Sequence, residues 1–363
     1  MRLFAIALTA ALFLQSEQGL RVPAFAPPTK TAAPITDAER ASLREGIALY
    51  EQGKLDEALG KFLDVLTFSP DNTFAMYEIA MVALAKKDYQ RAIDMAAKGT
   101  EYKADTAALA QYYSLIGNTL DAAKEPKKAV DVYTKGLEIA PAAGLYYNLA
   151  VTLVQGMSDT DGAKAALKKG ARVDPSHAGT HLMLGKLYLV DDLKTPALLA
   201  FSRFLMLEPA TQRTAEGYQL WFRMLNGTLT PNKEGAGATI SINPNQKKDE
   251  GDLMKLDLFI SLSKASAAAG AEGKPQIQQL VVQLDSLFGV WSKQDPGADK
   301  ETFLWTYYMP FAAEMQKNNL VEPFVYFVSQ RTNLPGVPEW IKANGDRLKA
   351  FVEWARNYRF PKS

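Results

Sequence analysis

Small, bulky and helix-breaking residues recur at a fixed interval along the first two thirds of this chain. Ala129, Ala163 and Ala197 stand 34 positions apart. A bulky residue follows each alanine by four positions, at Tyr133, Leu167 and Phe201, and a proline follows it by twelve, at Pro141, Pro175 and Pro209. Ala58, Phe62 and Pro70 show the same offsets earlier in the chain. The pattern predicts helix hairpins in which a small residue lets two helices approach, a bulky one fills the space beside them, and proline ends the second helix.

Glycines precede three of these alanines by twelve positions, at Gly46, Gly117 and Gly185. Together, the interval and the offsets resemble the tetratricopeptide-repeat family over residues 39–225. We place five repeats, of which the second is degenerate: Glu39 to Asn72, Thr73 to Asp105, Ala110 to Ala142, Ala143 to Ser176, and Ala178 to Ala210. The resemblance implies an all-α superhelix of about five stacked repeats, and Thr214 to Leu225 is the expected capping helix.

The start of the chain has the pattern of an export signal. Arg2 precedes an apolar run from Leu3 to Leu14, which only Thr9 interrupts. This run is too short to cross a bilayer, so we expect a signal peptide at residues 1–16 with cleavage after Ser16; cleavage near Ala26 and an uncleaved anchor are alternatives. Residues 17–35 contain four prolines and are expected to form an extended, weakly ordered linker before a repeat domain at residues 36–227.

Beyond Asn226 the repeat pattern disappears. Thr239 to Ile242 alternates apolar and polar residues as a short strand does, although no partner strand is evident. Helical patterns then return in four stretches and in a last helix that ends near Tyr358: Leu253 to Ala269, Gln276 to Ser292, Lys300 to Lys317 and Val321 to Gln330. Residues 228–363 are therefore expected to be a mostly helical domain with an aromatic core, entered through a short strand and loop.

Composition narrows the classes of function. The 363 residues include 41 basic and 40 acidic side chains, so no overall charge favours nucleic acid. The chain has no cysteine, which excludes disulfides, thiolate metal sites and a cysteine nucleophile. With the signal pattern, this composition favours a bacterial periplasmic or extracellular protein that does not span a membrane after the signal is removed.

Three short motifs suggest chemistry, but each lacks an essential part. His177 and His181 have the spacing of two metal ligands on one helix face, yet no third ligand is evident. Asp159 and Asp161 resemble the opening of a calcium loop, but an alanine replaces the third ligand. Residues 235–237, Gly-Ala-Gly, lack the context of a phosphate-binding loop, and no serine-hydrolase motif occurs. We therefore expect no metal, no cofactor and no enzymatic activity.

The resemblance also implies where a partner binds. In this family, partners lie along the concave face formed by the first helix of each repeat. The corresponding positions here are mostly apolar or aromatic: Phe74, Tyr77, Met81, Ser114, Asn118, Asp121, Tyr147, Val151, Leu182 and Lys186. Only Asn118 and Lys186 match the family's carboxylate clamp, which makes chaperone-tail binding a poor fit. Whether a partner or the C-terminal domain covers this groove remains open at the level of sequence.

The interpretation from sequence is thus an exported, non-catalytic scaffold or adaptor that binds a protein or peptide in the concave groove. The alternative is a glycan- or envelope-polymer-binding protein that uses the aromatic residues of the C-terminal region: Trp291, Trp305, Tyr307, Tyr308, Trp340 and Trp354. Because Trp305, Tyr308 and Phe311 recur at helical intervals, a core position is favoured for them.

Overall fold

The computed structural model describes residues 19–226, 229–231, 238–240, 246–271 and 273–361. The expected signal peptide, residues 1–16, lies outside these residues. The chain forms two compact units, Met1–Ala166 and Leu167–Ser363. This boundary falls inside a helix of the fourth repeat, whereas the boundary expected from the repeat pattern is at 227/228; the expected domain division stays a prediction.

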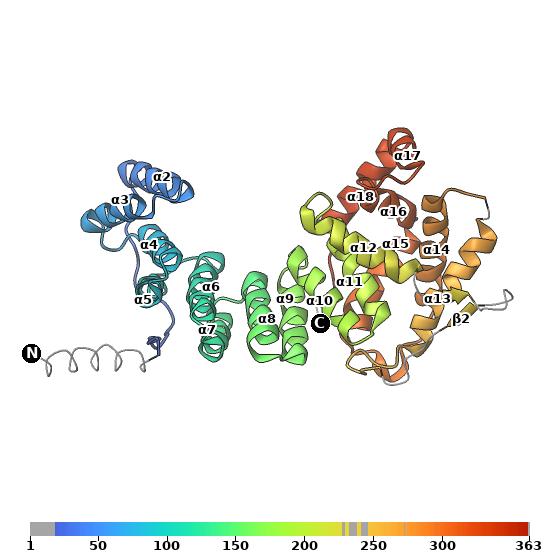
Figure 1. Cartoon of the computed structure of the whole chain (residues 1–363), viewed down its shortest axis with the longest axis horizontal. Helices are drawn as coiled ribbons and strands as arrows, with labels where there is room; N and C mark the ends of the chain where they lie inside the picture. Colours follow the sequence, from blue (N-terminus) through green and yellow to red (C-terminus); the bar gives the residue numbers. More distant parts are fainter. Residues whose placement is uncertain (1–18, 227–228, 232–237, 241–245, 272, 362–363) are drawn as a thin grey trace, which may run out of the picture. The chain divides into compact units, whose positions relative to one another are not determined.

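The first unit is a series of antiparallel helix hairpins, drawn in blue to green in Figure 1. Its helices are α2 (Asp37–Glu51), α3 (Leu55–Phe68), α4 (Thr73–Ala85), α5 (Tyr89–Gly99), α6 (Thr106–Ala122), α7 (Pro126–Ile139), α8 (Ala143–Met157) and the first half of α9 (Thr160–Val173). Thr36 and Glu39 form the expected capping box at the start of α2, because each side chain satisfies a backbone N–H of the other. The all-α class predicted from the sequence is confirmed.

The first, third and fifth hairpins are each closed around a glycine and an aromatic ring. A Cβ atom at Gly46 would lie 2.5 Å from Cε1 of Phe62, and one at Gly117 would lie 2.2 Å from Cε1 of Tyr133. The fifth hairpin, in the second unit, repeats the arrangement with 2.7 Å between such an atom at Gly185 and Phe201. The glycines therefore serve the role that the pattern predicts: they let the ring of the second helix lie against the backbone of the first.

The segment before α2 is extended but well anchored. Its backbone pairs with the end of α5, where Lys103 N donates to the carbonyl of Lys30 at 2.8 Å. Phe25 packs edge-on against Tyr113, with ring centroids 5.2 Å apart. Nearer the N-terminus, Leu20 N donates to Glu125 Oε1 at 2.8 Å. Residues 19–35 thus contact the first unit at several points, and we call them the strap; the weakly ordered linker that the prolines predict there stays a prediction.

The second unit is built around the second helix of the fifth repeat. Its helices are α10 (Ala178–Val190), α11 (Lys194–Leu207), α12 (Gln212–Asn226), α13 (Met254–Gly270), α14 (Gln276–Trp291), α15 (Met309–Lys317), α16 (Val321–Val328), α17 (Val337–Ala343) and α18 (Gly345–Asn357). Every residue from Thr195 to Met206 of α11 is buried, because α10, α12, α13 and α16 all contact this helix. The C-terminal helices therefore share one core with the last repeat (Figure 1).

Two details of the second unit differ from the sequence expectation. The single helix expected at Lys300 to Lys317 is a short 3₁₀ turn, Gly297–Asp299, then a π-helix, Leu304–Tyr308, that continues into α15. Pro310 has no N–H for the hydrogen bond to residue i−4 that an α-helix requires, and this accounts for the wider π-helical turn that precedes it. The short strand does have a partner: β1 (Leu229–Pro231) pairs antiparallel with β2 (Ala238–Ile240).

Candidate partner-binding site

Helix α4 presents the most exposed part of the expected groove. Asn72 caps this helix by accepting a hydrogen bond from Ala75 N at 3.0 Å, and the cap fixes which residues of the first turn face outward. Phe74 is 63% exposed, while Tyr77 and Met81 are partly buried on the turns that follow. A phenylalanine with most of its surface in water contributes little to folding, and it is therefore available to a partner.

Helix α6 contributes a polar section. Tyr133 of α7 reaches across so that its hydroxyl donates toward Asn118 Oδ1 at 2.7 Å and Asp121 Oδ2 at 3.1 Å. Thr152 of α8 also donates to Asp121. Burial raises the pKa of Asp121 above its ordinary value, although these hydrogen bonds oppose the shift. Asp121 is thus held in place by the hairpin itself, whereas Asn118 is exposed and keeps its amide N–H groups available to a ligand.

The other expected positions in the first unit are partly buried. Ser114 lies on α6, and Tyr147 and Val151 lie on α8. The sequence interpretation omitted the first repeat, in which Ile47 occupies the position equivalent to Met81 and is 37% exposed. Helix α2, which carries Ile47, contacts α4, which carries Phe74. Ile47 directly follows Gly46, the small residue of the first repeat, and this offset is the sequence signal that identifies Ile47 as a groove position.

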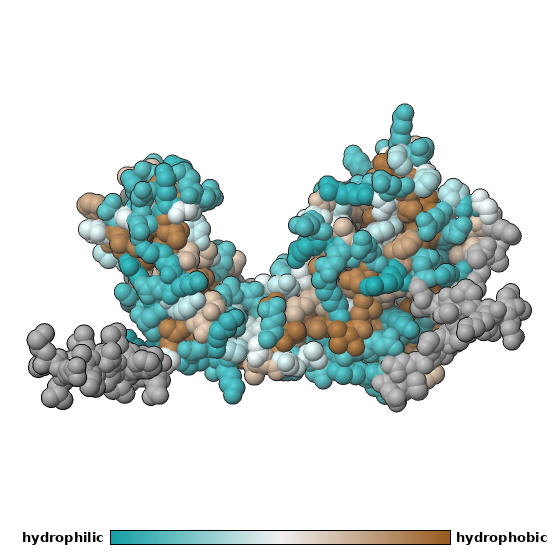
Figure 2. Space-filling model, in the orientation of Figure 1, coloured by the Kyte–Doolittle hydropathy of each residue, from teal (hydrophilic) through white to brown (hydrophobic). Residues whose placement is uncertain are grey.

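We call the candidate surface for a partner, which consists of Ile47, Phe74, Tyr77, Met81 and Asn118 of the first unit, the partner-binding surface. Hydrophobic residues interrupt the otherwise hydrophilic surface at the α2–α5 end of the molecule (Figure 2). The ring of Tyr77 packs edge-on against the ring of Tyr112, with ring centroids 5.6 Å apart. The surface therefore combines one exposed aromatic ring, a braced aromatic ring, aliphatic side chains and an amide.

The fifth repeat does not present its expected positions in the same way. Leu182 is only 6% exposed within the second unit, so it belongs to the core. Lys186 is partly exposed, but its ammonium group lies 2.7 Å from Glu216 Oε1. An ion pair and a buried leucine offer much less to a partner than α4 does.

The strap uses other parts of the first unit. Its contacts include Asp71 just before α4, Gln90 of α5, Glu101 and Lys103 just after α5, Tyr113 of α6, Glu125 just before α7 and Lys128 of α7. None of these residues belongs to the partner-binding surface. The contacts of the strap are therefore made with other residues of the first unit.

Both histidines have structural roles. His181 is fully buried; its Nδ1 lies 2.8 Å from the Tyr308 hydroxyl and its Nε2 lies 3.0 Å from the Pro175 carbonyl. Burial lowers the pKa of His181 to about 3, so the ring is neutral at physiological pH. His177 caps α10 through Thr180, at 2.8 Å from its hydroxyl. With both ring nitrogens of His181 engaged, the pair cannot chelate a metal without rearrangement.

The other motifs are also accounted for or undescribed. Asp159 accepts a hydrogen bond from Gly162 N at 2.8 Å, as a residue that starts a helix does, so the turn into α9 explains the calcium-like pattern. Residues 235–237 lie outside the described part of the chain. Among the described residues, no helix has the length and apolar character needed to cross a membrane.

Buried carboxylates in the second unit hold elements together. Glu250 is completely buried, and it accepts hydrogen bonds from Tyr188 at 2.6 Å and from Leu304 N at 2.7 Å while Lys168 lies 2.6 Å away. Asp257 of α13 accepts from Thr195 N at 2.9 Å and thereby caps α11. Several fixed partners on each buried carboxylate are typical of structural groups.

The aromatic residues of the C-terminal region are packed against one another. Trp291, Tyr307 and Tyr308 are completely buried. Trp340 stacks on Tyr326 with ring centroids 4.2 Å apart, and Trp354 packs beside Phe311. Trp305 is partly buried. Glycan platforms need ring faces open to solvent, and the complete burial of Trp291, Tyr307 and Tyr308 removes these three rings from such a platform.

Comparison with known proteins agrees with the hairpin geometry. Residues 43–108 and 110–142 each match a family model described as tetratricopeptide repeat. This chain therefore contains tetratricopeptide repeats, and its consecutive helix pairs are those of that fold.

Solved structures with similar repeats are distant in sequence. YrrB, described as a TPR protein with an unusual peptide-binding site, is 18% identical, with 50% of this chain and 94% of YrrB covered and a TM-score of 0.35. MamA from Desulfovibrio magneticus RS-1 is 21% identical, with 49% and 99% covered and a TM-score of 0.37. PilW, a type IV pilus biogenesis factor, is 13% identical, with 52% and 91% covered and a TM-score of 0.40.

Proposed function

We propose that this protein is an exported, non-catalytic scaffold that binds a protein or peptide partner on the partner-binding surface of its first unit. The observation that carries the proposal is Phe74, a large apolar side chain that is 63% exposed at a position on the first helix of a tetratricopeptide repeat. Interface energy concentrates in a few aromatic anchors that lose their water on binding. Tyr77, braced by Tyr112, and the amide of Asn118 supply a second anchor and a hydrogen-bonding group beside it.

Export is the second part of the proposal. The charged start and apolar run at residues 1–16 support it, and the absence of cysteine is compatible with an oxidising compartment. N-terminal sequencing of the protein from its native cells tests this part separately: a start at Glu17 supports it, and an intact Met1 in the cytoplasmic fraction contradicts it.

The binding proposal is tested with a pair of matched variants. Phe74→Ala removes the exposed ring on α4, and Phe68→Ala removes a ring that is 86% exposed at the end of α3, the second helix of its hairpin. Proteins captured by the wild type from native cells are compared with those captured by each variant. We expect at least one protein to be lost by roughly tenfold with Phe74→Ala and retained with Phe68→Ala. Equal capture by all three proteins would contradict the proposal.

A further inference from the structure

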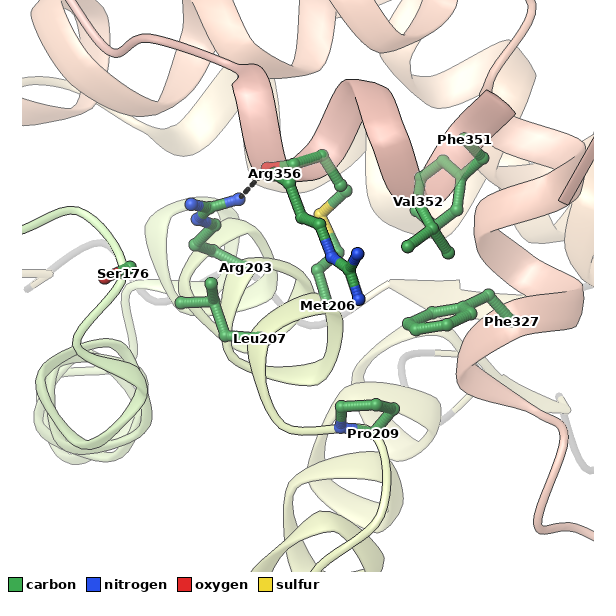
Figure 3. A pocket seen from close by; sticks show the side chains of 10 residues that line it. Ser176, Arg203, Met206, Leu207, Pro209, Phe327, Phe351, Val352 and Arg356 are labelled. Atoms are coloured by element: carbon green, nitrogen blue, oxygen red, sulfur yellow. Dashed lines mark hydrogen bonds between the residues drawn. The ribbon is translucent and has the colours of Figure 1, made fainter. Parts of the chain in front are cut away.

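Two adjoining cavities in the second unit share the side chains of Arg203 and Arg356. The smaller, which we call the apolar cavity, has a volume of about 290 Å³ and lies between α11, α16 and α18. Figure 3 shows Met206, Phe327 and Val352 around it, with the guanidinium group of Arg356 extending over the opening. The larger, which we call the arginine cavity, measures about 870 Å³.

The arginine cavity is strongly unbalanced in charge. Its lining contains Arg172, Arg203, Arg356 and Arg359, and Asp174 is its one carboxylate. One oxygen of that carboxylate, Asp174 Oδ1, accepts hydrogen bonds from Ser176 N at 2.8 Å and from the Ser176 hydroxyl at 2.5 Å. Four guanidinium groups around one carboxylate leave a net positive recess.

Arg203 is the central and most deeply buried of these side chains. It is 3% exposed, and its N–H groups reach only backbone carbonyls, at 3.4 Å from Ala355 and 3.3 to 3.4 Å from Pro175. The bond to Ala355 is the dashed line in Figure 3. Its guanidinium carbon lies 5.0 Å from the ring centre of Phe360. In the described part of the chain, no carboxylate forms an ion pair with it.

The guanidinium group of Arg172 is also incompletely paired. One terminal nitrogen donates to the Thr306 hydroxyl at 2.9 Å, while the other, Nη1, is buried and has no hydrogen-bond partner. The group lies against Phe303, 5.1 Å from its ring centre. An uncompensated buried cation is costly, and an anion that enters the cavity would remove this cost.

We propose that the two cavities together bind an acidic segment of a polypeptide, with its carboxylates among the arginines and an adjacent apolar side chain in the apolar cavity. The planar guanidinium group matches a carboxylate with two parallel hydrogen bonds. Arg203 and Arg356 border both cavities, so an acidic residue held by them places its neighbour at the opening between Met206 and Val352.

The dimensions favour a peptide over other anions. A single inorganic phosphate fills only a small part of 870 Å³ and leaves the apolar cavity empty. A membrane surface requires basic groups that project outward, whereas Arg203 is buried and Arg172 is partly buried. A segment that combines carboxylates with one apolar side chain satisfies both cavities. This site is separate from the partner-binding surface and does not depend on it.

The test uses the full chain and a defined probe, the fluorescent peptide Glu-Glu-Phe-Glu-Glu with both ends blocked, measured by fluorescence polarisation at low ionic strength. The test variant is Arg356→Gln with Arg359→Gln, which changes two exposed side chains of the lining. The control variant is Arg331→Gln with Lys342→Gln, which removes the same charge at exposed positions outside both cavities.

We expect the test variant to weaken binding about tenfold and the control variant less than about twofold. We also expect weaker binding when glutamine replaces the peptide's glutamates, or glycine its phenylalanine. Equal weakening by both variants would show non-specific attraction and overturn the proposal. Saturation by inorganic phosphate, or binding to phosphatidylglycerol vesicles, in the absence of peptide binding would overturn it in favour of a small-anion or a membrane site.

Discussion

Gly117 lies directly against the ring of Tyr133, so closely that a Cβ atom at residue 117 would come within 2.2 Å of Cε1. The hydroxyl of the same ring donates toward Asn118 and Asp121 on α6. One side chain therefore closes the helix crossing of the third repeat and orients the polar section of its outer face. Packing and surface chemistry are linked at this residue.

Replacing Gly117 by alanine should destabilise the protein, because neither the ring nor the helix backbone can give way easily. We expect a loss of about 1 to 3 kcal/mol in the free energy of unfolding. Gly60→Ala is the matched control, since nothing lies within 4 Å of a Cβ atom there and alanine is the better helix former. Thermal unfolding of the two variants checks this; an unchanged melting temperature for Gly117→Ala would mean that the crossing is looser than described.

The strap should contribute to the stability of the first unit. Phe25→Ala removes the edge-on contact with Tyr113, for which about 0.5 to 1.5 kcal/mol is expected beyond the apolar area lost. Thr31→Ala changes an exposed residue of the same segment and serves as control. Limited proteolysis provides the second readout, because a released strap becomes accessible. Equal cleavage of residues 19–35 in wild type and Phe25→Ala would contradict the anchoring role.

His181 should make stability depend on pH. Its folded-state pKa of about 3 lies below the ordinary value of 6.5, so between these values the unfolded chain binds a proton that the folded protein excludes. Above pH 6.5, His181 hardly changes the free energy of unfolding. As the pH drops from 6.5 toward 3, the free energy of unfolding falls. From about pH 7 to about pH 5, the wild type should lose roughly 2 kcal/mol more than His181→Gln.

Chemical denaturation of both proteins at the two pH values measures this difference. A variant that is less stable throughout still tests the claim, because only the slope with pH is compared. Parallel pH profiles would contradict the claim, because they would show that the folded protein binds this proton as readily as the unfolded chain does.

Much of the fold follows from the sequence because the repeat encodes local contacts. The spacing of Gly117, Ala129 and Tyr133 specifies which atoms meet within one hairpin, and a helix hairpin needs no information from distant residues. The capping box of Thr36 and Glu39 is equally local. Such features are predictable because the interacting positions lie a fixed number of residues apart.

Contacts between distant residues were not predictable in this way. Phe25 meets Tyr113, Arg203 meets Ala355, and Asp257 caps a helix 62 residues earlier at Thr195. No interval in the sequence marks these pairs. The same reason explains Leu182: its repeat position indicates an exposed surface, but the second unit buries it. Of the expected site, Phe74 on α4 and Asn118 on α6 are the exposed residues, while the arginine cavity had no sequence motif at all.

Site-specific crosslinking at position 74 tests the central claim most directly. A photoreactive phenylalanine analogue at Phe74 retains the ring, and the same analogue at Phe68 probes an equally aromatic and even more exposed position. After irradiation in native cells, the account predicts a discrete crosslinked adduct from position 74 that position 68 does not give. Adducts that are identical at both positions, or that form only at position 68, would contradict binding on the first helices of the repeats.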